Sequence, residues 1–152
     1  MIGWKHGDKY QLHILETPEQ MTRVENLQRK IWSGNDTEIV PGHLLLATVH
    51  NGGLVIGAFK LDQERSHPGW FETSNNFEEN LVGFVFSFPG FQSFQDEIKL
   101  KHCSHLLAVL PEHENFGIGF ALKRAQWQMV RRQNIEWVTW TFDPLLSRNA
   151  HL

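Results

Sequence analysis

The sequence predicts an α+β domain, in a three-layer α/β arrangement, built on a mixed and mostly antiparallel sheet. Apolar residues that alternate or run continuously, as they do in strands, occur at 10–15, 54–60, 81–88, 101–110 and 136–142. The last two of these strands flank a helix, and this order implies a parallel crossover, whereas the earlier strands suit antiparallel pairing. The 152 residues suffice for a single domain with a real core, residues 1–152.

The first part of the chain carries two predicted helices. Residues 1–9 are expected to form a polar lead-in to the first strand. Thr17 and Gln20 fit the two ends of a capping box, and apolar residues at helical spacing extend this helix to about Trp32. A second, apolar helix is expected to end at the glycine pair 52–53.

The middle of the chain is expected to interrupt the sheet twice. The polar stretch 62–80 is longer than an ordinary hairpin loop, so we expect it to be either functional or mobile. The pair Pro89-Gly90 is expected to end the strand at 81–88, because proline cannot donate a hydrogen bond to a sheet ladder.

The turn between the strand at 101–110 and the helix at 117–133 carries the strongest functional signal. Pro111 ends the strand, and Gly117 and Gly119 begin the helix. The first N–H groups of a helix have no partner within it, and the positive end of the helix dipole lies beside them. Glycine lets a ligand approach such a backbone closely. The turn therefore predicts a phosphate-bearing cofactor; a helix start that binds nothing is the simpler alternative for an isolated Gly-x-Gly.

Composition narrows the class of protein. The net charge of −3 argues against a main role in nucleic-acid binding, which usually needs a basic surface. A single cysteine, Cys103, excludes an intrachain disulfide and suits a reducing compartment. No apolar run is long enough for a membrane span, and the N-terminus does not read as a signal peptide. We therefore expect a cytoplasmic protein with neither a nucleic-acid nor a membrane partner.

The same turn carries a resemblance to a known family. Val109-Leu110-Pro111 is followed by Glu-Asn-Phe-Gly-Ile-Gly at 114–119. This resembles the central motif of the GNAT superfamily of acyl-CoA-dependent N-acyltransferases, in which Val-x-Pro precedes Arg/Gln-x-x-Gly-x-Gly/Ala. Glu114 departs from the motif's Arg/Gln. The segment 140–152 is similar to a little-characterised branch of predicted acetyltransferases in the same superfamily.

The resemblance implies a GNAT-like acyl-CoA N-acyltransferase fold and acetyl-CoA, or another acyl-CoA, as cofactor. The pyrophosphate would lie on the backbone after the glycines, and pantetheine would lie along the end of the preceding strand. A carboxylate at Glu114 would have to point away from the pyrophosphate or weaken binding, and Lys123 or Arg124 could meet the 3′-phosphate. The cofactor-binding residues implied are Ala108, Val109, Glu114, Asn115, Phe116, Gly117, Ile118, Gly119 and Asn149.

The resemblance also implies direct acyl transfer to an amine, with a backbone N–H near Val109 steadying the oxyanion. The candidate bases are His105 and Glu112. Regular alternation puts His105 on the face of Val109 and opposite to His102, which disfavours a shared metal ion; a core histidine is the alternative. The family's usual acid is a tyrosine in a later helix, a role that the one tyrosine of this chain, in the first strand, does not fill.

Two functions remain open from the sequence. One is an acyltransferase acting on a small-molecule or peptide amine; the other is a degenerate GNAT-like module that binds coenzyme A or a protein without catalysis. A complete domain of this family would continue past residue 152, so we expect a single GNAT-like domain that is incomplete at its C-terminus. The strand at 136–142 would then have an exposed edge, which could pair with a second copy in a homodimer.

Overall fold

The computed structural model describes residues 3–6, 9–33, 36–61 and 80–141. One sheet has the strand order β1-β2-β3-β4-β5-β6, antiparallel except for the last pair, β5–β6. Its strands are β1 (Gly3–His6), β2 (Tyr10–Ile14), β3 (Leu54–Lys60), β4 (Leu81–Phe94), β5 (Glu97–Val109) and β6 (Val138–Thr139). The helices are α1 (Pro18–Ile31), α2 (Gly42–His50) and α3 (Ile118–Arg132), with short 3-10 turns η1 (Asp36–Glu38) and η2 (Pro111–His113).

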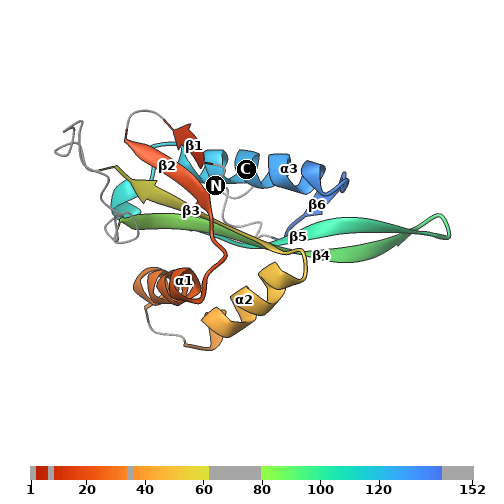
Figure 1. The fold of residues 1–152 in the computed structure, drawn as a ribbon, viewed down its shortest axis with the longest axis horizontal. Helices are drawn as coiled ribbons and strands as arrows, with labels where there is room; N and C mark the ends of the chain where they lie inside the picture. The colour runs from red at the N-terminus through yellow and green to blue at the C-terminus, as the bar shows by residue number, and fades with distance from the viewer. Residues whose placement is uncertain (1–2, 7–8, 34–35, 62–79, 142–152) are drawn as a thin grey trace.

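The three layers that the sequence predicts are present. Helices α1 and α2 cover one face of the sheet, and α3 covers the other (Figure 1). Alternate residues of the central strands fill the two interfaces: Phe84 packs with Leu45 on the α1/α2 face, and Val85 packs with Leu122 on the α3 face. None of the helices in the described ranges is long and apolar enough to cross a membrane.

Helix α1 begins as expected and is tied to α2 by a buried glutamine. Thr17 Oγ1 accepts from Gln20 N–H, and the Gln20 side chain accepts from Thr17 N–H, which completes the capping box. One turn before the end of α1, Gln28 Nε2 donates to Val40 C=O and Gln28 Oε1 accepts from Val40 N–H, both at 2.9 Å. Because Gln28 is fully buried, these bonds replace water for two backbone groups just before α2.

Two sequence expectations about strands are wrong. Part of the supposed lead-in at 1–9 forms β1, which pairs with β2. Strand β4 also runs through Pro89 to Phe94 instead of ending at Pro89-Gly90. Pro89 lies opposite His102, whose N–H points away from β4 to Trp137 C=O, so this is a pair without mutual backbone bonds. The ladder with β3 has already ended at Ser87, so the N–H that proline lacks has no strand to meet.

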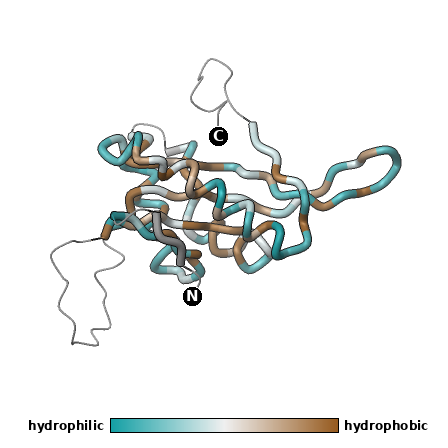
Figure 2. The backbone as a smooth tube through the Cα atoms, turned by 90° about the horizontal axis from the view of Figure 1, so that it is seen from above, coloured by the Kyte–Doolittle hydropathy of each residue, from teal (hydrophilic) through white to brown (hydrophobic). Residues whose placement is uncertain are grey.

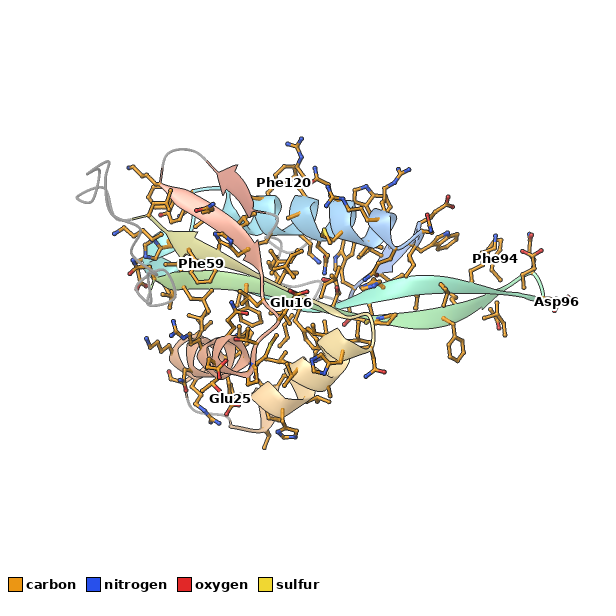
Figure 3. All side chains as sticks on the ribbon, in the orientation of Figure 1. Glu16, Glu25, Phe59, Phe94, Asp96 and Phe120 are labelled. Carbon is orange, nitrogen blue, oxygen red and sulfur yellow. The ribbon has the colours of Figure 1, made fainter. Side chains whose placement is uncertain are left out.

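Strands β4 and β5 consequently form a long hairpin, and its outer part extends as an arm beyond the helices (Figures 1 and 2). Gln95 and Asp96 make the turn with φ of 49° and 65°, as expected for a tight hairpin turn of the type I′ class. Phe94 and Asp96 lie at the far end of the arm (Figure 3). The apolar pair Phe91–Leu100 bridges the two strands and is mostly exposed.

The pairing of β5 with β6 is short. It comprises His102↔Val138 and Cys103↔Thr139 in the described part of the chain, so the strand predicted at 136–142 is shorter than expected. Its parallel direction agrees with the prediction. We call the point just beyond this pairing, where Ser104 on β5 and Trp140 after β6 follow the last paired residues, the fork. The homodimer expected through the exposed edge of the strand at 136–142 stays a prediction.

A chain of polar contacts, buried at Ser87 and His102 and exposed at Gln133, joins β5 to β4 and to the end of α3 beside the fork. Gln133 Nε2 donates to Gly52 C=O at 3.0 Å, which turns Gln133 Oε1 toward His102 Nε2 at 2.7 Å. His102 Nε2 therefore donates, and His102 Nδ1 accepts from the Ser87 hydroxyl at 3.0 Å. His102 is fully buried and on the α3 side, which is opposite to His105, as predicted.

Replacing Gln28→Leu should lower the free energy of unfolding by about 2–4 kcal/mol, because the N–H and C=O of Val40 would stay buried without their partner. Urea unfolding followed by circular dichroism measures this. The matched control is Arg29→Ala, which removes an exposed ion pair with Glu25 (2.8 Å) from the next position and should cost less than about 1 kcal/mol. Equal losses in the two variants would contradict the role of Gln28.

Acid should destabilise the fold through His102. Burial lowers the pKa of His102 below 6.5, although its bond to Gln133 acts in the opposite direction, and burial also lowers the pKa of His13. Below pH 6.5 the unfolded chain therefore binds more protons than the folded one. As the pH is lowered from 6.5, the free energy of unfolding falls until the pH passes the lowered pKa of the folded state. Above pH 6.5 the free energy of unfolding does not depend on these groups. Unfolding measured from pH 7.5 to 5 should show a shallower decline for His102→Gln. An unchanged slope would exclude this source.

Candidate active site

A cavity of about 410 Å³ opens where four elements meet, and we call it the β5–α3 cavity. Its size falls within the usual range for small-molecule sites. The end of β5, the η2 turn, the start of α3 and the end of α1 each contribute to its wall; Phe120, in the first turn of α3, marks its location in Figure 3. The lining residues are Ile31, Trp32, Leu107, Ala108, Val109, His113, Glu114, Asn115, Gly117, Ile118, Gly119 and Phe120.

The turn before α3 leaves backbone donors free at this cavity. Asn115 and Gly117 adopt left-handed φ values of 67° and 74°, which asparagine tolerates and glycine prefers. Gly117 is the N-cap residue and supplies no side-chain cap, and the first helical bond runs from Ala121 N–H to Gly117 C=O. The N–H groups of residues 118–120 therefore have no bond within the helix, and all three residues line the cavity. These donors lie where the sequence predicts an anion site, and the binding of an anion there stays a prediction.

The open edge of β5 supplies a second set of backbone groups. Leu110 N–H donates to Val82 C=O on the β4 side at 2.8 Å. Alternation along the strand turns the N–H groups of Val109 and Leu107 to the opposite edge. Within the described residues, β6 pairs with β5 only at His102 and Cys103, so this edge meets no strand beside the cavity. An amide-bearing ligand could pair with it as an added strand does.

Most of the predicted cofactor-binding residues are assembled here. Glu114 lies on the cavity wall, which favours the second of the two expectations for it, a weakened binding of the pyrophosphate. Phe116 is absent from the lining; its ring lies 5.9 Å from that of Tyr10. Asn149 falls outside the described residues.

Tyr10 supports the cavity wall from a distant part of the chain. Its hydroxyl lies 3.0 Å from His113 Nδ1, and the two rings meet edge to face at 5.8 Å. Tyr10 is buried in β2, whereas His113 lines the cavity. With Nδ1 accepting from Tyr10, the Nε2–H of His113 remains available as a donor. The sequence gives no signal for this pair, because its members are 103 positions apart.

A β-bulge overturns the expected orientation of His105. Phe86 pairs with Leu106 but Ser87 pairs with Ser104, so His105 is the extra residue. Its ring lies 6.0 Å from both Phe86 and Phe88 on the α1/α2 face, whereas Val109 packs on the α3 face. The prediction that His105 and Val109 share a face is therefore wrong, because it assumed an unbroken alternation.

His105 lines a second cavity, of about 560 Å³, which we call the α2 cavity. Helix α2 forms one wall and the β4–β5 pair forms the other. The lining residues are Val40, Leu44, Ala47, Thr48, Asn51, Phe86, Phe88, Pro89 and His105. Glu112, the other candidate base, is exposed on η2 and lines neither of the two cavities.

Lys123, one of the two cations that the sequence offers for a 3′-phosphate, is held at the fork. Its Nζ donates to Ser104 Oγ at 2.6 Å and lies 4.8 Å from the centre of the Trp140 ring. Gln126 Nε2 donates to the same hydroxyl at 3.0 Å. Burial lowers the pKa of Lys123 to about 8, and Cys103 acts weakly in the opposite direction. The sequence analysis missed this cluster, because a lysine in a helix with several arginines reads as part of a solvated face.

Comparison with known proteins identifies the fold. No model of a protein family matches the sequence, and no curated protein matches it. Among solved structures, an aminoglycoside acetyltransferase from an uncultured soil metagenomic sample, in complex with trehalose, is similar with a TM-score of 0.70 and 17% identity, over 97% of this chain and 86% of that one. AAC(6′)-Iy in complex with a CoA-containing bisubstrate analog gives 0.64 and 14%, over 93% and 86%.

A third similar structure has a protein substrate in its name. The ribosomal-protein-alanine N-acetyltransferase of Brucella melitensis biovar Abortus 2308 gives a TM-score of 0.60 at 12% identity, over 93% of this chain and 86% of that one. At these identities the likeness concerns the fold, and it agrees with the motif around Gly117 and Gly119, with the sheet order and with the parallel β5–α3–β6 unit. The chain has the fold of the GNAT superfamily of N-acyltransferases.

Proposed function

We propose that this chain is an acyl-CoA-dependent N-acyltransferase that moves an acetyl group directly from acetyl-CoA to an amine. One observation carries the proposal: the β5–α3 cavity joins free helix N–H groups to an open strand edge in a single space. The first suits a pyrophosphate and the second suits the amides of pantetheine. Similar folds have been solved with CoA or with a CoA-containing analog, which supports this class of cofactor.

The amine would bind in the α2 cavity, with His105 as its base. His105 precedes Leu106 and Leu107 on β5, so this cavity begins where the cofactor cavity ends along the strand. A neutral imidazole there can take a proton from the attacking amine, directly or through water. The oxyanion of the intermediate would form beside the reacting thioester, at the His105 end of the open β5 edge.

The lining of the α2 cavity favours an amine with an apolar body. Phe86, Phe88 and Leu44 contribute rings and branched carbon, and the described lining contains no carboxylate. A polycationic amine needs paired negative charge when it is removed from water, whereas a monoamine with an aromatic or alkyl group needs only the apolar wall and one acceptor. We therefore propose a small apolar monoamine, in contrast to the aminoglycosides named for several similar structures.

The second candidate function is a module that binds coenzyme A without catalysis. Glu114 favours it, because a carboxylate on the cavity wall repels a pyrophosphate. His113 on the same wall offers a compensating donor. The two functions differ in turnover: the module binds acetyl-CoA but releases no CoA in the presence of an amine.

The variant Gly119→Glu should abolish acetyl-CoA binding, because it places a second carboxylate among the free N–H groups of α3. Isothermal titration calorimetry with acetyl-CoA measures the loss, which should exceed tenfold in Kd. The charge-matched control is Gln128→Glu, about 13 Å further along the helix axis, which should leave Kd unchanged. Equal affinity of Gly119→Glu and the unaltered chain would overturn the cofactor site.

The variant Glu114→Gln provides the opposite test at the same site. Removal of one negative charge near the pyrophosphate should tighten acetyl-CoA binding by about threefold to tenfold. This gain should shrink at high salt, because salt screens the repulsion. Weaker binding of Glu114→Gln would mean that this carboxylate helps to hold the cofactor.

Phe88→Ala should raise the KM for an aromatic monoamine by about tenfold, with a small effect on the KM for acetyl-CoA.

His105→Gln should instead lower kcat by about a hundredfold at unchanged acetyl-CoA affinity, because it removes the base. CoA release with phenethylamine, hexylamine and sisomicin as acceptors measures both effects. A higher kcat/KM for sisomicin than for the two monoamines would refute the apolar acceptor.

A further inference from the structure

The fork brings together a lysine and the open edge of β5. β6 pairs with Cys103 and no further along the described part of β5. The next residue on β5, Ser104, and the residue after β6, Trp140, both contact the ammonium of Lys123, at 2.6 Å from Oγ and 4.8 Å from the ring centre. Lys123 therefore occupies the point at which the two strands part, on the α3 face.

The length of the cofactor would place its thioester at this point. From Val109 to Ser104 the edge of β5 covers about 16 Å at roughly 3.3 Å per residue. A pantetheine arm has about as many backbone bonds as four to five residues, so it spans about 15 Å when extended. With the pyrophosphate at the N-terminus of α3 and pantetheine along the edge, the sulfur would lie near Ser104 and Lys123. This placement rests on the proposed function.

We propose that Lys123 is the acid of the transfer reaction: its ammonium gives a proton to the thiolate of coenzyme A as the carbon–sulfur bond breaks. The new bond joins the amine nitrogen to the acyl carbon, and the electron pair of the broken bond stays on sulfur. His105 takes the proton that the nitrogen loses, and Lys123 supplies the one that sulfur gains. Neutral Lys123 then regains a proton from solvent and protonated His105 loses one to it, so the products are an amide and a free thiol and both residues return to their starting states.

The surroundings of Lys123 suit this role. Ser104 and Gln126 are buried, and their bonds hold the ammonium in one position at the edge of the strand. Burial brings the pKa of Lys123 to about 8, close to the roughly 8.5 of an ordinary thiol, so the transfer needs little driving force. A lysine in water would bind its proton too tightly for this step.

The charged and titratable groups around Lys123 are few. Cys103 is adjacent on β5, and His102 is engaged with Ser87 and Gln133. Trp140 presents an uncharged ring from the segment after β6. On α3 itself, Arg124 is exposed. The pH profile of the reaction should therefore report Lys123 at its alkaline side.

The experiment compares Lys123→Met and Lys123→Arg with the unaltered chain, using acetyl-CoA and phenethylamine as the acceptor. In the unaltered chain kcat should fall above pH 8. Both variants should lose about a hundredfold in kcat, since methionine has no proton and arginine holds its own too tightly, and the alkaline fall should disappear. Acetyl-CoA affinity measured by calorimetry should change less than threefold. Arg131→Met, an exposed cation two turns further on, is the control and should keep the kcat and pH profile of the unaltered chain.

The outcomes separate this proposal from the proposed function. Turnover in Lys123→Met with normal kcat and an unchanged alkaline limb overturns the role of Lys123 and leaves the acyltransferase intact. A loss of kcat that leaves the alkaline limb in place means a structural role and also overturns it. Absence of turnover in the unaltered chain, with acetyl-CoA still bound, overturns both proposals in favour of the binding module.

Discussion

The early separation of β5 from β6 is the constraint on which the site depends. A strand in the middle of a sheet has both edges paired, whereas β5 loses its second partner after Cys103 in the described part of the chain. Backbone groups seldom remain without hydrogen bonds, so such an edge needs water, another segment or a ligand. The α3 N-terminus lies at the far end of the same edge, with three further N–H groups outside the helix bonds. In the proposed function they form a site of fixed length, with the pyrophosphate at one end and the reacting thioester at the other.

The bulge at His105 changes which face of the sheet the residues after it on β5 occupy. Ordinary alternation already puts His105 opposite to its neighbour Ser104. The extra residue shifts the residues that follow, so His105 lies against Phe86 and Phe88 on the α1/α2 face while Val109 lies on the α3 face. Ser104 remains on the α3 face with Lys123. The proposed base, His105, and the proposed acid, Lys123 beside Ser104, lie on opposite faces of β5, which suits a reaction that takes a proton on one side and gives one on the other.

The sequence predicted what local chemistry decides. The capping box of Thr17 and the left-handed turn at Gly117 depend on residues within a few positions, and both are present in the structure. The sequence-based prediction failed where the pairing of strands determines the structure. Pro89 was expected to end a strand, but the ladder with β3 ends before it, so its missing N–H costs nothing. The Tyr10–His113 and Ser104–Lys123 contacts join residues that only the folded sheet brings together, and no local pattern announces them.

Glu114 shows how local and long-range constraints compete in one site. The turn that leaves the α3 N–H groups outside the helix bonds also places Glu114 on the cavity wall. The compensation comes from outside the motif, because Tyr10 on β2 holds His113 with its second nitrogen available. In the proposed enzyme, cofactor affinity would depend on the balance between this carboxylate and the donors around it. Moderate binding would suit the release of coenzyme A after each turnover.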